Sequence, residues 1–201
     1  MFYEFNGYRP VVHERAFVHP QANVTGNVII EADVYIGPGA VLRGDWGEIQ
    51  VGKGCNIQEN CVVHMFPGKS AIFEPSAHIG HGAIIHGARI GQNSLVGMNA
   101  VVMDDVIVEE ECLIAALCFV PANTKIPRRS LVAGQPAKVI KTLSDTMINW
   151  KTEGTKLYQR LPRECKTHLR ACEPLRSIPA HRKKQNFDNY LTWSDYQKKH
   201  S

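Results

Sequence analysis

A six-residue period in the aliphatic side chains restricts the fold of this chain more than any other feature of its sequence. The period begins with Val18, Val24, Ile30, Ile36 and Leu42. After three inserted residues it resumes at Val51, Ile57 and Val63, and a loop from Met65 to about His78 follows. It restarts at Ile79, slips once near Ile84 and Ile85, and continues through Ile90, Val96, Val102, Val108, Ile114, Val120, Ile126 and Val132.

A period of six is not that of either common element. An α-helix repeats about every 3.6 residues and a half-buried strand about every two. We therefore predict that each repeat is a short flat strand and a tight turn, with one aliphatic side chain pointing inward. Three repeats make a triangular coil of about 18 residues, and the coils stack as a parallel β-solenoid with glycine or small residues at the corners.

The pattern changes after residue 140, which predicts a different C-terminal structure. Ser144 offers a helix N-cap, and the apolar residues after it predict a helix that packs one face on the solenoid. Pro162 is expected to kink this helix or to start a second one that continues to Cys172. We predict a β-helix domain at 1–140, a helical segment at 141–180 and a basic tail at 181–201. Residues 134–137 are the predicted hinge, and the tail is expected to be mobile or ordered by a neighbouring subunit.

The charge of the chain is divided unevenly. Residues 138–201 carry 14 Lys+Arg against 6 Asp+Glu, a net +8, and residues 1–137 carry 9 against 13, a net −4. The basic residues lie on a predicted helical segment without interleaved aromatics, so we predict no nucleic-acid partner. A solvated helix face and attraction for an anionic ligand both remain open.

The N-terminal sequence and the cysteines bear on location. The first residues have no basic and apolar signal-peptide pattern, and no apolar run approaches the roughly 20 residues that span a bilayer. The six cysteines have no disulfide-framework or C-x-x-C spacing. We therefore predict a cytoplasmic protein without a membrane partner and with reduced, mostly packed thiols, Cys61 among them.

Three histidines are the strongest candidates for chemistry. His64 follows the inward Val63 and His86 follows the inward Ile85, so both occupy the same place in their repeats. Their separation equals one coil plus a loop excess, which predicts that they stack on one face, about 5 Å apart. His81 follows Ile79 by two residues and must point from a different face.

Three imidazoles with an open fourth position are the ligand set of a catalytic zinc site. One chain cannot easily aim all three at one point. A threefold assembly can, with His64 and His86 from one subunit and His81 from its neighbour. We therefore predict a homotrimer with metal sites at its interfaces, where zinc, iron or cobalt would suit imidazole ligands. The alternative is that these are surface or core histidines without a ligand role.

Two polar pairs precede the histidines. Arg43 and Asp45 are two residues apart at a predicted turn, where a charge-assisted pair could bridge subunits and orient the ligands, or be only a structural ion pair. Asn56 and Gln58 flank the inward Ile57. Gln58 lies one repeat before His64, so it could hold a water or a substrate oxygen, or only cap a turn. His78 and the other histidines have no ligand spacing.

Taken together, these motifs resemble the gamma-class carbonic anhydrase family of left-handed β-helix proteins over about residues 8–170. The motifs are Leu42-Arg43-Gly44-Asp45, Asn56-Ile57-Gln58-Glu59-Asn60 and the stretch from Ile79 to Gly87. Leu95 to Ala100, Gly134 to Ala137, and Trp150 followed by Tyr158-Gln159 are similar to the branch with the phenylacetic acid degradation and carnitine operon proteins. The ending Glu173-Pro174-Leu175-Arg176 and the basic stretch His181 to Lys184 favour the phenylacetic acid degradation member.

The resemblance implies an all-β left-handed parallel β-helix with a C-terminal α-helical segment, a trimer, and one divalent metal per interface. It also implies either hydration of carbon dioxide or hydrolysis of a CoA thioester. In the well-characterised carbonic anhydrases of this family, two acidic residues serve as proton shuttles. Their places here hold Trp46 and the loop Phe66-Pro67-Gly68-Lys69.

Fast hydration of carbon dioxide needs a proton route, whereas thioester hydrolysis needs no dedicated shuttle. We therefore predict a metal-dependent hydrolase of acyl-CoA thioesters in phenylacetate-type catabolism. His64, His81 and His86 are the expected metal ligands, and Arg43, Asp45, Asn56 and Gln58 are the expected catalytic residues. A gamma-type carbonic anhydrase is the alternative, followed by a hexapeptide acyltransferase with one histidine as general base and by a non-catalytic accessory trimer.

Overall fold

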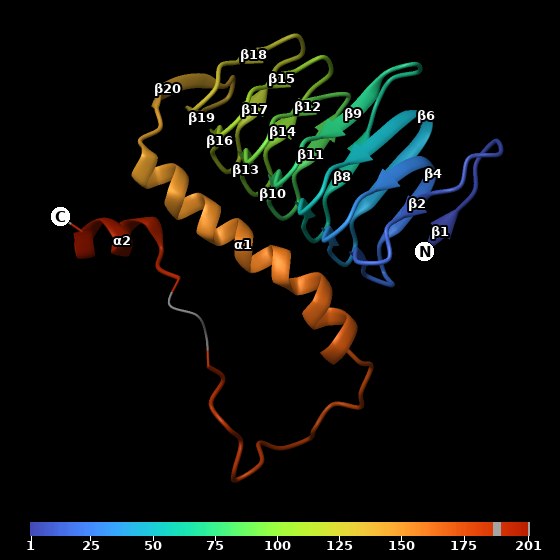
Figure 1. The fold of residues 1–201 in the computed structure, drawn as a ribbon, viewed down its shortest axis with the longest axis vertical. Coiled ribbons are helices and arrows are strands. Elements are labelled where there is room, and N and C mark those ends of the chain that lie inside the picture. The colour runs from blue at the N-terminus through green and yellow to red at the C-terminus, as the bar shows by residue number, and fades with distance from the viewer. Residues whose placement is uncertain (187–189, 201) are drawn as a thin grey trace.

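The computed structural model describes residues 1–186 and 190–200 and shows a parallel β-helix with one long helix along its side (Figure 1). One eight-stranded sheet forms the face beneath the long helix. Its strands are β3 (Phe17–Val18), β5 (Tyr35–Ile36), β7 (Asn56–Ile57), β10 (His78–Ile79), β13 (Leu95–Val96), β16 (Leu113–Ile114), β19 (Ser130–Ala133) and β20 (Lys138–Thr142).

A twelve-stranded sheet forms the other two faces, because the long strand β6 pairs with β8 through its first residues and with β9 through its last. Its strands are β1 (Phe2–Tyr3), β2 (Val11–Val12), β4 (Asn23–Ile30), β6 (Val41–Val51), β8 (Val62–His64), β9 (Ser70–Phe73), β11 (Ile84–His86), β12 (Arg89–Ile90), β14 (Val101–Val102), β15 (Ile107–Val108), β17 (Phe119–Val120) and β18 (Lys125–Ile126). The predicted parallel solenoid is confirmed.

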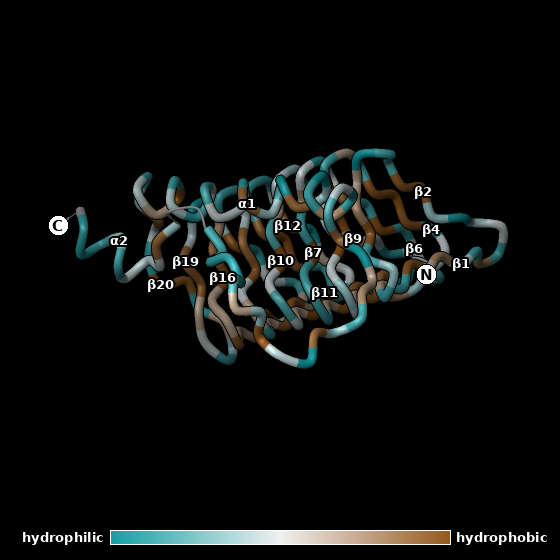
Figure 2. Tube along the Cα trace, turned by 90° about the horizontal axis from the view of Figure 1, so that it is seen from below, coloured by the Kyte–Doolittle hydropathy of each residue, from teal (hydrophilic) through white to brown (hydrophobic). Residues whose placement is uncertain are grey.

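The core of the β-helix consists of the aliphatic positions that the six-residue period predicts to point inward. All of those from Val24 to Val132 are buried, and Figure 2 shows hydrophobic positions recurring coil after coil. In β11 the inward residue is Ile85, which is fully buried, whereas Ile84 is 40% exposed. The slip in the period therefore falls between Ile85 and Ile90.

The prediction that Arg43 and Asp45 lie at a turn was wrong. Both residues lie inside the continuous strand β6. The strand stays extended where it pairs with β4, since Gly26 and Gly44 let the two backbones come very close. A Cβ atom at Gly26 would lie 2.4 Å from the carbonyl oxygen of Gly44. The ladder between β4 and β6 shifts register directly after this close approach, so Asp45 lies in the stretch of β6 without a ladder partner, and its carboxylate is positioned by Arg43 and His64.

The C-terminal elements begin with a hairpin. Residues 134–137 join β19 to β20, which pair antiparallel, so they are a hairpin connection and the predicted hinge to the helix was wrong. Helix α1 (Asp145–His168) begins at the predicted N-cap, where the Ser144 side chain accepts a hydrogen bond from the Met147 backbone N–H. The helix continues through Pro162 to His168, so Pro162 starts no second helix.

Helix α1 runs back along the β-helix toward the N-terminal coils and contacts β3, β5 and β7 (Figure 1). The chain then returns to the start of α1, where the short helix α2 (Trp193–His200) packs beside it. The prediction of a mobile tail falls partly on residues 187–189 and 201, which lie outside the described residues. In the part of the chain that the structure describes, neither helix is long and apolar enough to cross a membrane.

Candidate metal centre

His64 and His86 lie side by side on neighbouring coils. The pairing of β8 with β11 aligns the two residues directly, and their ring centroids are 5.3 Å apart. This confirms the predicted stacking. The Nδ1 atom of His64 is 3.3 Å from the Nε2 atom of His86, so one nitrogen of each ring is directed at the other.

The remaining nitrogen of each ring contacts a carboxylate. His64 Nε2 is 3.0 Å from Oδ1 of Asp45, and His86 Nδ1 is 2.7 Å from Oδ1 of Asp104. An ionised carboxylate only accepts hydrogen bonds, so each neutral ring carries its proton on the nitrogen that faces the carboxylate. The two nitrogens that face each other are then both lone-pair acceptors, and a cation between them would use both.

The spacing of these two nitrogens fits a metal ion. Nitrogen ligands lie about 2.0–2.1 Å from zinc, so two ligands of a tetrahedral ion are about 3.3 Å apart. His64 Nδ1 and His86 Nε2 have this separation. Among the residues that the structure describes, no group of three or more His, Cys, Asp and Glu side chains could hold a metal ion. A metal ion at the His64–His86 pair would therefore need further ligands from outside this pair.

Asp45 connects the pair to Arg43. Its second oxygen, Oδ2, accepts a hydrogen bond of 2.6 Å from Nη1 of Arg43. Burial alone would raise the pKa of Asp45, but the hydrogen bonds from Arg43 and His64 outweigh it and hold the pKa below its usual value. Burial lowers the pKa of His64 in spite of its contact with Asp45, which keeps the ring neutral at pH 7, as a ligand must be.

Asp104 is a site residue that the sequence analysis missed. It lies 18 residues after His86, but β11 pairs with β14 in a register of 17 residues, so counting one coil from His86 leads to Met103, one residue short of Asp104. The sequence analysis noted Trp46 and Phe66 only because they replace acidic residues of the family pattern. Trp46 lies 5.1 Å from the His64 ring and Phe66 lies 5.2 Å from the His86 ring, and both side chains are exposed. They make an apolar wall beside the two histidines.

His81 lies apart from this pair, in the turn between β10 and β11. Its Nδ1 atom contacts the carboxylate of Glu59, which sits in the corresponding turn one coil below. The His81 side chain is 47% exposed, so it projects from a corner of the β-helix into the surroundings. The Glu59 contact fixes the proton on Nδ1 and leaves Nε2 as the nitrogen with a lone pair.

Asn56 and Gln58 are buried beneath α1 and do not reach His64 within the chain. Gln58 Nε2 donates to Oδ1 of Asn56 at 2.9 Å and lies 2.8 Å from Nε2 of His78. His78 in turn contacts Thr155 of α1 through Nδ1, at 3.3 Å. Burial lowers the pKa of His78 to about 3, so this histidine, which the sequence analysis set aside, is a neutral link between the helix and Gln58.

Gln58 and Glu59 are consecutive, and Glu59 contacts His81. Gln58 therefore lies one coil below the turn that presents His81, at the same corner of the β-helix, whereas His64 and His86 lie on another face. The predicted site residues thus form two groups in one chain. The first contains Arg43, Asp45, His64 and His86, and the second contains Asn56, Gln58 and His81.

Together, the coils, the inward aliphatic column and the histidine pair define the class of protein. A family model described as bacterial transferase hexapeptide (six repeats) matches residues 9–44 and 87–122. The carnitine operon protein CaiE of Escherichia coli (strain K12) is 45% identical over 181 residues, which cover 90% of this chain and 92% of CaiE. The chain belongs to this family of hexapeptide-repeat, left-handed β-helix proteins, in the group that contains CaiE.

Two solved structures have the same fold. A hexapeptide transferase family protein from Anaplasma phagocytophilum is 33% identical, with a TM-score of 0.78 over 81% of this chain and 96% of that one. A Bacillus cereus protein described as an acetyltransferase is 28% identical, with a TM-score of 0.81 over 83% of this chain and 96% of that one. These descriptions concern those proteins, and the reaction of the present chain is a separate question.

Proposed function

We propose that the chain is a metal-dependent hydrolase of acyl-CoA thioesters that works as a homotrimer. The observation that carries the proposal is the separation of 3.3 Å between His64 Nδ1 and His86 Nε2, with a carboxylate on the far nitrogen of each ring. Carboxylates behind ligating histidines are the usual second layer of a metal site, because they fix the tautomer and raise the basicity of the ligand.

The trimer supplies the missing ligand. His81 is exposed at a corner with Nε2 available, while the His64–His86 pair lies on a face of the β-helix. We infer that each interface joins the face of one subunit to the corner of the next. His64 and His86 of one chain and His81 of its neighbour then hold one divalent metal, most readily zinc, with iron and cobalt also suited to imidazole.

A divalent metal in this position supplies a Lewis acid that lowers the pKa of water toward 7 and polarises a carbonyl. The chain's own residues do the rest. Asp45 and Asp104 hold the two histidine tautomers, and Arg43 holds Asp45. Gln58 would arrive with the neighbour's His81. Because its Nε2 already contacts Asn56 and His78, its carbonyl oxygen is left to accept a hydrogen bond from the attacking water or to orient it.

The aromatic wall supports a thioester with an apolar acyl group. Trp46 and Phe66 place their rings about the histidine pair, where an acidic proton shuttle would serve a carbonic anhydrase. A phenylacetyl-type group could stack on such rings. Carbonic anhydrase activity remains the second candidate, because the same histidines and the Arg43–Asp45 pair would serve it. Its turnover would be slow, because Trp46 and the Phe66 loop take the places of the acidic proton shuttles.

The family description and the Bacillus cereus neighbour support an acyltransferase as a third candidate. Such chemistry needs one histidine as general base and no second ligand. The aligned His64–His86 pair, with a carboxylate behind each ring, contains more polar groups than an acyltransferase requires. A non-catalytic accessory trimer is the remaining alternative, and it would explain no aspect of the carboxylate arrangement.

Metal analysis and three assays on the purified full chain separate these candidates. We expect about one divalent ion per chain, hydrolysis of phenylacetyl-CoA, and loss of hydrolysis on chelation that returns on reloading. Hydrolysis that survives complete metal removal would contradict the proposal. Faster turnover of carbon dioxide than of any thioester would favour the second candidate, and acetyl transfer to an amine by metal-free protein would favour the third.

The second carboxylate gives a sharper prediction. Replacing Asp104 by Asn removes the ionised acceptor behind His86 while keeping its size, so the affinity for zinc should fall about 10–100-fold. Titration of metal-free protein with zinc measures this. Asp105 is the matched control, because it follows directly and its carboxylate pairs with Lys69 at 2.9 Å and not with a histidine. Equal affinities for Asp104→Asn and Asp105→Asn would show that the carboxylate has no role at the metal.

A further inference from the structure

The third proposed ligand, His81, has a support of its own away from the His64–His86 face. Its Nδ1 atom contacts one oxygen of Glu59, and the other oxygen accepts a hydrogen bond of 2.9 Å from the Tyr35 hydroxyl. The three side chains come from consecutive coils, because β5, β7 and β10 are neighbours in the eight-stranded sheet. The Glu59 carboxylate therefore links a phenol on one coil to an imidazole two coils further on.

The chain leaves space for this carboxylate. A Cβ atom at Gly37, two residues after Tyr35, would lie 2.8 Å from the backbone nitrogen of Glu59 and 2.9 Å from its Oε1 atom. Gly37 does not have a left-handed φ, so its backbone conformation does not require glycine. The close approach of Glu59 does require it, because a side chain at residue 37 would push the carboxylate away from Tyr35.

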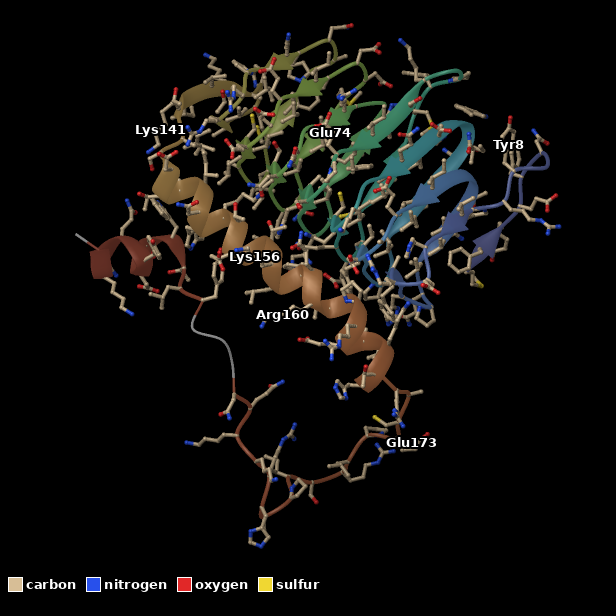
Figure 3. The ribbon with its side chains drawn as sticks, viewed as in Figure 1. Tyr8, Glu74, Lys141, Lys156, Arg160 and Glu173 are labelled. Atoms are coloured by element: carbon tan, nitrogen blue, oxygen red, sulfur yellow. The ribbon has the colours of Figure 1, made fainter. Side chains whose placement is uncertain are left out.

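The ring of Tyr35 is packed on two sides. It is 7% exposed, stacks on Phe17 with centroids 6.0 Å apart, and lies 6.1 Å from the ring of Tyr158. Tyr158 belongs to α1, in the stretch between Lys156 and Arg160, which are labelled in Figure 3. A ring held in this way has little freedom left to lose, so its hydroxyl offers a hydrogen bond at a fixed place.

The protonation of the three side chains gives each hydrogen bond a direction. Burial and the contact with Glu59 raise the pKa of Tyr35, so its hydroxyl keeps the proton and donates a hydrogen bond. Burial alone would raise the pKa of Glu59, but hydrogen bonds from its own backbone N–H, from Tyr35 and from His81 hold the pKa below its usual value. Glu59 is therefore an ionised acceptor between two donors, and the donor on the imidazole is the Nδ1–H group.

We propose that Tyr35 is a positioning residue for the metal ligand His81 and acts through Glu59. The hydroxyl holds the carboxylate, and the carboxylate holds the Nδ1 proton and the orientation of the ring. Nε2 then keeps its lone pair for a metal shared with the neighbouring subunit. The inference rests on the proposed interfacial site, in which Arg43 has the same place behind Asp45.

Zinc titration of the metal-free full chain tests this assignment. Tyr35→Phe removes the hydroxyl and keeps the ring, so it should weaken zinc binding about 3–10-fold, less than the loss of a carboxylate directly behind a ligand. Tyr158→Phe is the matched control, because its ring packs on Tyr35 but its hydroxyl makes no hydrogen bond to Glu59. It should bind zinc as the wild type does. Equal zinc affinities in the two variants would overturn the assignment.

A spectroscopic measurement separates positioning from a structural role in fastening the coils. In metal-free protein with isotope-labelled histidine, the imidazole nitrogen shifts report the tautomer, and His81→Gln assigns the signal. We expect the proton on Nδ1 of His81 in the wild type and in Tyr158→Phe, and a mixture of both tautomers in Tyr35→Phe. A weakened zinc affinity in Tyr35→Phe with the wild-type tautomer would mean that the hydroxyl only fastens the coils, and the proposal would fail.

The two proposals fail separately. Suppose that the wild type binds zinc and hydrolyses thioesters, and that Tyr35→Phe equals it in zinc affinity and tautomer. That result refutes the positioning role alone. A wild-type chain that binds no zinc refutes the metal centre, and the tautomer in Tyr35→Phe then decides whether Tyr35 positions His81.

Discussion

Mixing a His64→Ala chain with a His81→Ala chain is expected to restore about one quarter of the metal sites that both variants lack. Each interface is proposed to take His64 and His86 from one chain and His81 from the next. In the mixture, a metal site is complete only at an interface of one kind. There, a His81→Ala chain supplies His64 and His86 from its face, and a His64→Ala chain supplies His81 from its corner. Random assembly of equal amounts gives each condition a chance of about one half.

Each variant alone should bind zinc more than about 100-fold more weakly than wild type, because two imidazoles remain of the proposed three. Metal content and thioester hydrolysis after unfolding and co-refolding of the mixture are the measurements. Light scattering is needed to check that every sample assembles as a trimer. A mixture of His64→Ala and His86→Ala chains is the control. Both substitutions lie on the same face, so every chain lacks one of the two face ligands and no interface regains both. Restoration in the control, or none in the first mixture, would rule out sites shared between chains.

The β-helix could be predicted from the sequence because the six-residue repeat that specifies it can be read from residues close together in the chain. An inward aliphatic at every sixth position must be buried in each coil, and the residues from Val24 to Val132 follow that rule. The helix N-cap at Ser144 is equally local. The alignment of His64 with His86 followed from the same counting, because residues one coil apart lie next to each other.

What could not be predicted depends on contacts that the repeat does not specify. The period says nothing of which face α1 covers, so neither the burial of His78 nor its contact with Thr155 could be foreseen. Strand β6 passes through the expected turn because two glycines allow a close backbone approach from another coil. Coil counting would also have missed Asp104, since the register of 17 residues between β11 and β14 makes Met103, and not Asp104, the equivalent of His86.

The two groups of site residues are separate because they lie on different parts of the β-helix. His64 and His86 use the flat face of the β-helix, where parallel pairing places equivalent residues directly above one another. His81 uses a corner, where the chain turns and a side chain projects outward. A face and a corner of one subunit point in different directions, so a site that needs both links ligand binding to assembly.

The column of inward aliphatics leads to the second large expected effect. Ile90→Ala should lower the free energy of unfolding by about 2–5 kcal/mol, because it leaves a cavity between two neighbouring coils. Ile90 is fully buried and pairs with Phe73 on one side and Val108 on the other. In a stack of coils each layer contacts only its neighbours, so the chain cannot compensate by repacking elsewhere.

Ile107→Ala is the matched control for this change. Ile107 lies in the next coil of the same face, directly beside Arg89, but it points outward and is 43% exposed. The same substitution there should cost less than about 1 kcal/mol, because little apolar area leaves the core. Unfolding is followed by circular dichroism at one fixed protein concentration, since assembly makes the midpoint depend on concentration. Comparable losses for both variants would mean that the six-residue period does not separate the inside of the β-helix from its surface, and the register that aligns His64 with His86 would lose its basis.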